Sequence, residues 1–134
     1  SKGKVNSYIF SSGSGLNTLE KSWAEKWSKL IGKDYFVEKV DKITLTSVVK
    51  KFKIQNKIDL LNIDVEGHET EVLNGSDLKL FRPKIITIEI HVKKTEDIFK
   101  TRVFKILHKN KYELISHYYH TCFFKAVEFE IETL

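Results

Sequence analysis

Two short apolar runs with a helical segment between them constrain the fold of this chain more than any other feature. The first, residues 58–63, reads IDLLNI, and the second, residues 84–90, reads KIITIEI and follows Pro83, the only proline. Both have the length and composition of buried strands. Residues 69–74 between them have a helical pattern, and we expect Gly75 to end this helix in the left-handed conformation. Strand, helix and strand within about 30 residues predict a right-handed parallel crossover.

The flanking regions extend this pattern on both sides. Before the crossover, spacings of four between Leu19, Trp23 and Trp27 predict a helix over about residues 17–27. A strand over 35–43 and a short helix that begins at Thr44 or Thr46 follow. After the crossover we expect a helix from residue 95, then an antiparallel pair of strands over 112–119 and 121–131. The fold class predicted is α/β, with a mixed sheet that has a parallel centre and antiparallel final strands.

Length and composition restrict the class of protein. With 134 residues, 41% of them hydrophobic, the chain has enough apolar material for a core, and we expect residues 1–134 to form a single domain. No apolar run approaches the about 18 residues of a membrane helix, and no signal-peptide pattern opens the chain. The lone Cys122 excludes an internal disulfide and fits a cytoplasmic location. The absence of methionine indicates a processed product or part of something longer.

The charge pattern argues against a nucleic-acid partner. The chain has 23 basic and 18 acidic residues and a formal net charge of +5, and only Arg82 and Arg102 are arginine. The lysines extend from Lys2 to Lys125 and alternate with the acids, whereas a nucleic-acid interface gathers them on one face. We therefore expect a solvated lysine-rich surface.

The candidate site lies where the two apolar runs end, because ligands of open α/β sheets bind beyond the carboxyl ends of parallel strands. If the strands are adjacent, their end residues lie roughly 5–10 Å apart and form one crevice. The candidates are Asp64, Glu66 and His68 after the first run, and Glu89 and His91 at the end of the second. Structural explanations compete with this interpretation: acids favour the first turn of a helix, and His68 could face solvent. They fit Glu89 least, because a carboxylate between two isoleucines needs a partner.

A metal site is not expected. His117, His120 and Cys122 include metal-ligand residue types, but residues 117 and 120 of one strand point to opposite faces. The chain also lacks a P-loop and the GxGxxG, GxSxG and HExxH motifs.

The stretch from residue 58 to residue 91 resembles the C-terminal half of FkbM-type methyltransferases, which are class I O-methyltransferases dependent on S-adenosylmethionine (SAM). The family pattern is roughly iDllKiDvEGhElevLkGa followed by rP-x-i-i-x-iE. The matching residues are Ile58, Asp59, Leu60, Leu61, Ile63, Asp64, Val65, Glu66, Gly67, Glu69, Val72, Leu73, Gly75, Arg82, Pro83 and Glu89. Segments 14–19 (SGLNTL), 44–47 and the aromatic Phe123-Phe124 extend the resemblance over nearly the whole chain. Asn62 departs from it, since the family usually has lysine there.

This resemblance implies the C-terminal part of a Rossmann-like class I methyltransferase fold, with SAM as cofactor and a hydroxyl of a small molecule or sugar as methyl acceptor. It places Asp64 and Val65 beside the cofactor. It makes Glu66, His68, Glu89 and His91 candidates for the base and for orienting the hydroxyl. The glycine-rich loop and the ribose-binding acid of the family belong to strands with no counterpart in residues 1–134. We therefore expect these residues alone to form an incomplete, inactive site.

Two further expectations follow from the resemblance. The strand over 58–63 would be an unpaired apolar edge, so we expect a homodimer through it or its coverage by residues 1–27. A non-catalytic scaffold that binds an acidic partner through its lysines is the alternative function. The carboxylates of Asp64, Glu66 and Glu89 favour the enzyme, because a scaffold does not need them.

Overall fold

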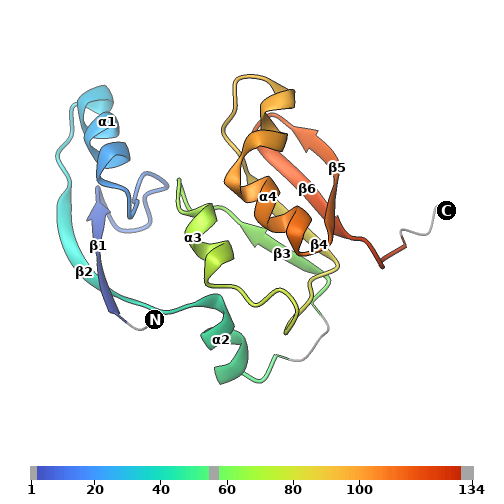
Figure 1. Ribbon diagram of the computed structural model, residues 1–134. Helices are drawn as coiled ribbons and strands as arrows, with labels where there is room; N and C mark the ends of the chain where they lie inside the picture. Colours follow the sequence, from blue (N-terminus) through green and yellow to red (C-terminus); the bar gives the residue numbers. More distant parts are fainter. Residues whose placement is uncertain (1–2, 55–57, 131–134) are drawn as a thin grey trace. The chain divides into compact units, whose positions relative to one another are not determined.

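The computed structural model describes residues 3–54 and 58–130, and these form two compact units (Figure 1). Unit 1 comprises Ser1–Thr44 and Val65–His68, and unit 2 comprises Leu45–Asp64 and Glu69–Leu134. No helix among the described residues is long and apolar enough to cross a membrane.

Unit 1 is a two-stranded antiparallel ribbon with one helix. Strand β1 (Gly3–Ile9) pairs with β2 (Phe36–Lys42), in a register from Gly3 opposite Lys42 to Ile9 opposite Phe36. Strand β2 confirms the expected strand, whereas β1 was missed, because its sequence GKVNSYI has polar residues at both alternations. The buried Tyr8 ring packs edge-on against Tyr35, with 5.5 Å between the ring centroids.

Helix α1 (Lys21–Ile31) begins four residues later than the spacing of its tryptophans predicts. The cause lies in the preceding loop. Thr18 and Tyr8 exchange two backbone hydrogen bonds of 2.8 and 3.1 Å, and the Asn17 side chain accepts a bond from the Phe10 amide at 2.9 Å. Residues 17 and 18 therefore cannot join the helix. At its other end, Gly32 adopts a left-handed conformation with φ 65° and donates its amide hydrogen to the Ser28 carbonyl.

Unit 2 is a four-stranded mixed sheet with helices. Along the chain it contains α2 (Leu45–Lys51), β3 (Leu60–Ile63), α3 (Glu69–Asn74), β4 (Ile85–Glu89), the 3₁₀ helix η1 (Thr95–Lys100), α4 (Arg102–Lys109), β5 (Tyr112–Tyr118) and β6 (Thr121–Ala126). The strand order is β3-β4-β6-β5, with β3 and β4 parallel and the other pairs antiparallel. The α/β class, mixed sheet and antiparallel final strands are confirmed. The expected parallel centre is wrong for the described sheet: β3 is its edge strand, so the parallel pair β3–β4 occupies one side, and the central pair β4–β6 is antiparallel.

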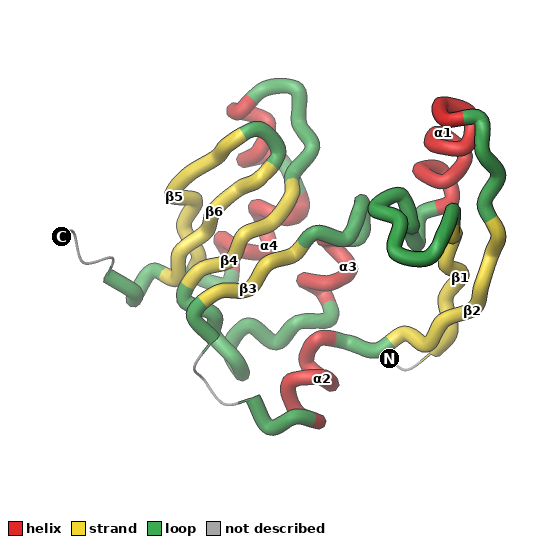
Figure 2. The backbone as a smooth tube through the Cα atoms, turned by 180° about the vertical axis from the view of Figure 1, so that it is seen from behind, coloured by secondary structure: helices red, strands yellow, loops and turns green. Residues whose placement is uncertain are grey.

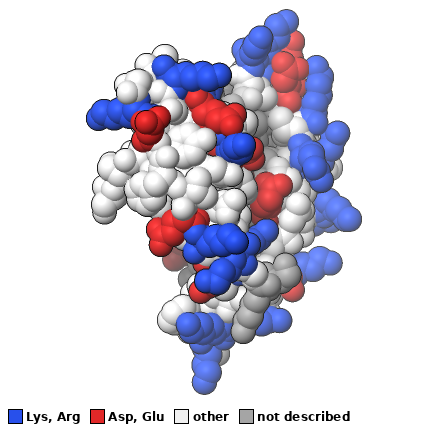
Figure 3. Space-filling view, turned by 90° about the vertical axis from the view of Figure 1, so that its left-hand side faces the viewer, with Lys and Arg blue, Asp and Glu red and all other residues white. Residues whose placement is uncertain are grey.

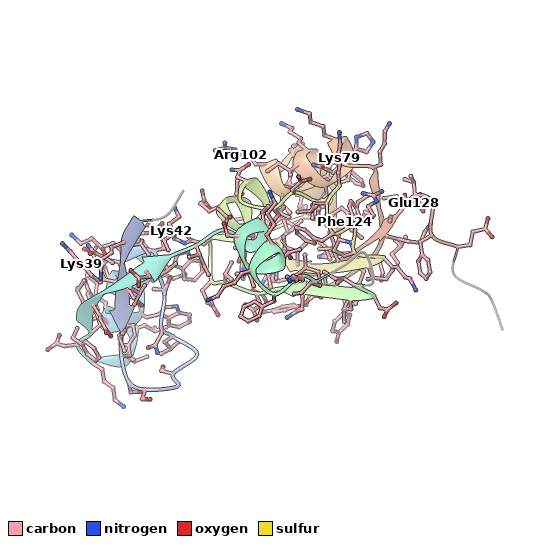
Figure 4. All side chains as sticks on the ribbon, turned by 90° about the horizontal axis from the view of Figure 1, so that it is seen from below. Lys39, Lys42, Lys79, Arg102, Phe124 and Glu128 are labelled. Carbon is pink, nitrogen blue, oxygen red and sulfur yellow. The ribbon has the colours of Figure 1, made fainter. Side chains whose placement is uncertain are left out.

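The core of unit 2 lies between the sheet and the helices α3 and α4, which cover the same face of the sheet (Figures 1 and 2). Buried side chains alternate along the central strands on this face: Ile86 and Ile88 on β4, and Cys122, Phe124 and Ala126 on β6. Figure 4 shows Phe124 in the interior, with Lys79, Arg102 and Glu128 nearer the periphery. This alternation leaves the odd-numbered residues of β4 and β6 on the other face.

Three expectations about the ends of helices and strands differ from the structure. Helix α3 ends at Asn74 as predicted, but Gly75 is not among the glycines with positive φ, so its role as a left-handed cap is wrong. The single helix expected from residue 95 is divided into η1 and α4. Thr101, which lies between them, has an extended backbone, and its hydroxyl accepts a hydrogen bond from the Phe104 amide at 3.1 Å as the N-cap of α4. Strand β6 ends at Ala126, and residue 131, where we expected its end, lies outside the described residues.

Strand β3 forms one edge of the described sheet, and its Leu60 is 57% exposed. Strand β1, which lies within the segment we considered as a cover, pairs with β2, and coverage of the β3 edge by residues 1–27 stays a prediction. Dimerisation through the β3 edge stays a prediction.

Arg82 links the segment before β4 to the segments before β5 and after β6 by hydrogen bonds. Its guanidinium donates to the carbonyls of Asn110 and Lys111 at 2.6 and 2.9 Å and to both carboxylate oxygens of Glu128 at 2.6 and 2.7 Å. The hydrogen bonds from Arg82 to the Glu128 carboxylate lower the pKa of Glu128 to about 2. The Tyr112 hydroxyl donates to the Pro83 carbonyl at 2.7 Å, and burial raises the pKa of Tyr112 to about 12. The Arg-Pro dipeptide that supports the family resemblance therefore has a structural role here.

Candidate strand-end site

The carboxyl ends of β3 and β4 lie side by side in unit 2, as predicted. Ile63 pairs in parallel register with Ile88, so the next residues, Asp64 and Glu89, occupy matching positions on strands about 4.8 Å apart. Asp64 is exposed and Glu89 is half-buried. Two carboxylates thus lie at neighbouring strand ends.

The Glu89 side chain lies on the face opposite the helices, because side chains alternate along a strand. Two residues before Glu89, and on the same face, Thr87 is buried, and its hydroxyl donates to the Asn62 amide oxygen at 2.7 Å. Asn62 occupies the position where the family usually has lysine. The Asn62 amide oxygen accepts the hydrogen bond of this buried hydroxyl, so the asparagine at this position has a structural role in the sheet.

Glu89 has the partner that its position requires. Its Oε2 lies 3.2 Å from Nε2 of His91, and the two side chains are 26% and 38% exposed. A carboxylate beside an imidazole orients the ring and stabilises the imidazolium that forms when the ring takes a proton. Glu89 and His91 therefore form a pair that can act as a base.

His120 also belongs to this site, and sequence reasoning considered it only as a metal ligand. Its ring centroid lies 4.4 Å from that of His91, and its carbonyl accepts the Ile90 amide at 2.8 Å. The sequence could have indicated this position. If the final strand pairs antiparallel with the strand that ends at Glu89, the beginning of the final strand lies beside Glu89. In the structure Thr121 pairs with Glu89.

The turn after β3 depends on its backbone conformation. Glu66 and Gly67 both have positive φ, 50° and 100°, and a Cβ at Gly67 would lie 3.1 Å from Nε1 of Trp23. The Thr18 hydroxyl donates to the Glu66 carbonyl at 3.4 Å, within unit 1. Gly67 is therefore required by conformation and by space.

The structure divides the candidate residues between the two units. Asp64, Glu89 and His91 belong to unit 2 and come together at the strand ends. Val65, Glu66 and His68 belong to unit 1, where all three are half-buried. Glu69, in the first turn of α3, is buried.

The described residues contain no cluster of three or more metal-ligating side chains. His117 pairs in register with Cys122, and its Nε2 lies 2.6 Å from the Tyr119 carbonyl oxygen. Cys122 is fully buried, and burial raises the pKa of its thiol to about 11, so the thiol is a poor ligand.

Charged side chains of both signs share the surface. Figure 3 shows lysines and arginines dispersed over the visible face, with acidic side chains between them. This distribution matches the expected solvated surface.

Comparison with known proteins identifies the family. A family model described as the methyltransferase FkbM domain matches residues 2–114, which is most of the chain. The comparisons with curated proteins and with solved structures gave no match. The match spans β1 to the first three residues of β5, including both strand ends and the DVEGHE segment between β3 and α3. The chain therefore belongs to the FkbM methyltransferase domain family.

Proposed function

We propose that this domain takes part in SAM-dependent O-methylation and transfers a methyl group to a hydroxyl of a small molecule or sugar. Family membership supports methyl transfer. The observation that carries the finer proposal is the juxtaposition of Asp64 with the Glu89–His91 pair at neighbouring strand ends. Its cytoplasmic location is part of the proposal, supported by a single, buried cysteine.

The residues at the end of β3 fit a cationic cofactor. Asp64 presents an exposed carboxylate, which can accept hydrogen bonds from an ammonium or hydroxyl group and favours a nearby positive charge. Val65 follows it with a half-buried apolar side chain. SAM carries an ammonium group and a sulfonium, and when bound it supplies the electrophilic methyl group. In this proposal Asp64 holds it, and the contact of Val65 with the cofactor stays a prediction.

The residues at the end of β4 fit the methyl acceptor. Glu89 orients the His91 imidazole through Nε2, and in this proposal that imidazole takes the proton of the acceptor hydroxyl. Glu89 then stabilises the imidazolium. Such a base contributes roughly 10²–10⁴-fold to a rate, and most of the remaining contribution comes from alignment of the reacting groups. Glu66 and His68 stay predictions for orienting the hydroxyl.

The test measures formation of S-adenosylhomocysteine from SAM by the natural protein that carries this sequence, with a panel of sugars and small hydroxyl compounds. Glu89→Gln keeps the shape of the side chain and removes its charge. Glu96→Gln, at an exposed acid of η1, is the matched control. We expect product with at least one acceptor, near-complete loss in Glu89→Gln and no loss in Glu96→Gln. Equal activity of the two variants would contradict the proposed role of Glu89.

A further inference from the structure

The turn between β5 and β6 brings a second imidazole to the end of β4. The ring centroids of His91 and His120 lie 4.4 Å apart, with the ring planes inclined at 46°. The His120 ring also packs against Tyr119, with 4.1 Å between the centroids. His120 therefore contacts both an exposed tyrosine and the imidazole of the Glu89–His91 pair.

Backbone contacts hold this turn in place. The His120 carbonyl accepts the Ile90 amide at 2.8 Å, which joins the turn to the residue between Glu89 and His91. Nε2 of His117 lies 2.6 Å from the Tyr119 carbonyl oxygen and closes the turn from within. Tyr119 has φ 56°, a left-handed conformation that a bulky residue rarely adopts. Since such backbone persists only where the surroundings hold it, the position of His120 is well determined.

The nitrogen atoms of His120 indicate how the ring acts. Its Nδ1 is buried and has no hydrogen-bond partner among the described residues. A hydrogen on a buried nitrogen without an acceptor is costly, so we infer that the ring carries its hydrogen on Nε2. The buried Nδ1 is inaccessible to a substrate, and the contact of the ring with His91 is a packing contact.

We propose that His120 is a positioning residue for the Glu89–His91 pair. Its ring packs against the His91 ring and limits the directions that this imidazole can take, so that Nε2 of His91 stays toward Glu89. The consequence for methyl transfer rests on the proposed function. The packing itself is a property of the chain and can be tested without any activity.

The experiment follows the His91 ring signals by NMR in the 134-residue chain labelled at histidine. The variants are His120→Ala, which removes the ring, and His120→Phe, which keeps an aromatic ring of similar size. His108→Ala is the control, because it removes a histidine of α4 that packs against Phe104 instead. We expect His120→Ala to shift the His91 ring signals through loss of the neighbouring ring current. We expect no shift in His108→Ala and a residual ring-current effect in His120→Phe.

Diethyl pyrocarbonate, which acylates accessible imidazoles, gives a second readout by peptide mass spectrometry. His91 should react faster in His120→Ala than in the unmodified chain, and His120→Phe should restore the slower rate. If His120→Ala does not fold, His120→Phe still tests the packing by itself. His91 signals and reactivity in His120→Ala that match those of His108→Ala would overturn the proposal. If the 134-residue chain shows the ring packing and the natural protein that carries it shows no methyl transfer, the result counts against the proposed function alone.

Discussion

Strands β3 and β4 are parallel neighbours in one sheet, yet their carboxyl ends are built differently. The chain leaves β3 through Glu66 and Gly67, two consecutive residues with positive φ. Glu89 and His91 at the end of β4 are held by side-chain contacts instead: a carboxylate–imidazole pair and a second ring packed against it. Backbone conformation therefore determines the first end, and side-chain contacts determine the second.

This difference indicates that the two strand ends have separate roles. A turn fixed by its backbone offers Asp64 as an exposed carboxylate, which suits the binding of a cationic cofactor. An imidazole held by Glu89 and His120 suits proton transfer, because it depends on the direction of one nitrogen. The predictions below separate these two roles.

The largest expected effect separates cofactor binding from proton transfer. Glu89→Gln should lower kcat about 10²–10⁴-fold and leave KM for SAM nearly unchanged, because the lost group acts on the acceptor. Asp64→Asn should mainly raise KM for SAM, by about tenfold or more, since a hydrogen bond to a charged group contributes about 1.5–3 kcal/mol. Steady-state kinetics of both variants checks the assignment. A reversed pattern would exchange the two roles.

Substitution at the turn after β3 should destabilise unit 1. Gly67→Ala places a Cβ 3.1 Å from Nε1 of Trp23 at a residue with φ 100°. We expect a loss of about 1–3 kcal/mol in the free energy of unfolding. Urea titration followed by tryptophan fluorescence measures it, because Trp23 and Trp27 both belong to unit 1. Gly15→Ala, where a Cβ meets nothing within 4 Å, is the control and should change stability little.

The free edge of β3 should allow the chain to self-associate. Leu60 is 57% exposed on this edge, and Leu60→Lys adds the kind of charge that edge strands use against pairing. We expect the unmodified chain to dimerise, and the variant to dimerise about tenfold more weakly, a difference of about 1.4 kcal/mol. Light scattering across a concentration series measures it, with Leu80→Lys as control, at a residue outside β3. A chain that stays monomeric at all concentrations contradicts the prediction.

The smallest effect concerns the ion pair between Arg82, just before β4, and Glu128. The pKa of Glu128 lies below its usual 4.5, at about 2, so its pairing with Arg82 stabilises the fold above pH 4.5 and is lost as the pH falls from 4.5 to 2. Because the side chain is 56% exposed, solvent screening limits this contribution to under about 1 kcal/mol. Unfolding of the unmodified chain and of Glu128→Gln should differ above pH 5 and converge near pH 2. A constant difference across this range would mean that the charge of Glu128 is not involved.

Periodicity predicted the parts of the fold that depend on local pattern. The strand–helix–strand unit from β3 to β4 follows from two apolar runs and the short segment between them, and the adjacency of Asp64 and Glu89 follows from parallel pairing. Strand β1 was missed because a two-stranded ribbon buries little, so the sequence has no clear alternation. The late start of α1 depends on Thr18, whose backbone pairs with Tyr8, a contact with no local signal.

The site was predicted in part for the same reason. Glu89 stood out as a carboxylate in an apolar strand that needs a partner, and the structure shows that this partner is His91, which we had expected only as a separate candidate. His120 was missed as a member of this site because it comes from a turn about thirty residues later, and its position depends on the insertion of β6 beside β4. Such a contact is a property of sheet order, which a single sequence does not encode locally.

The most direct test of the strand-end site is an NMR titration of SAM into the ¹⁵N-labelled natural protein that carries this sequence. The account predicts saturable shifts of the Asp64 and Val65 amides, with smaller shifts at Glu89 and His91, and their loss in Asp64→Asn. Absence of any shift at millimolar SAM, or saturable shifts confined to residues away from the ends of β3 and β4, would contradict it.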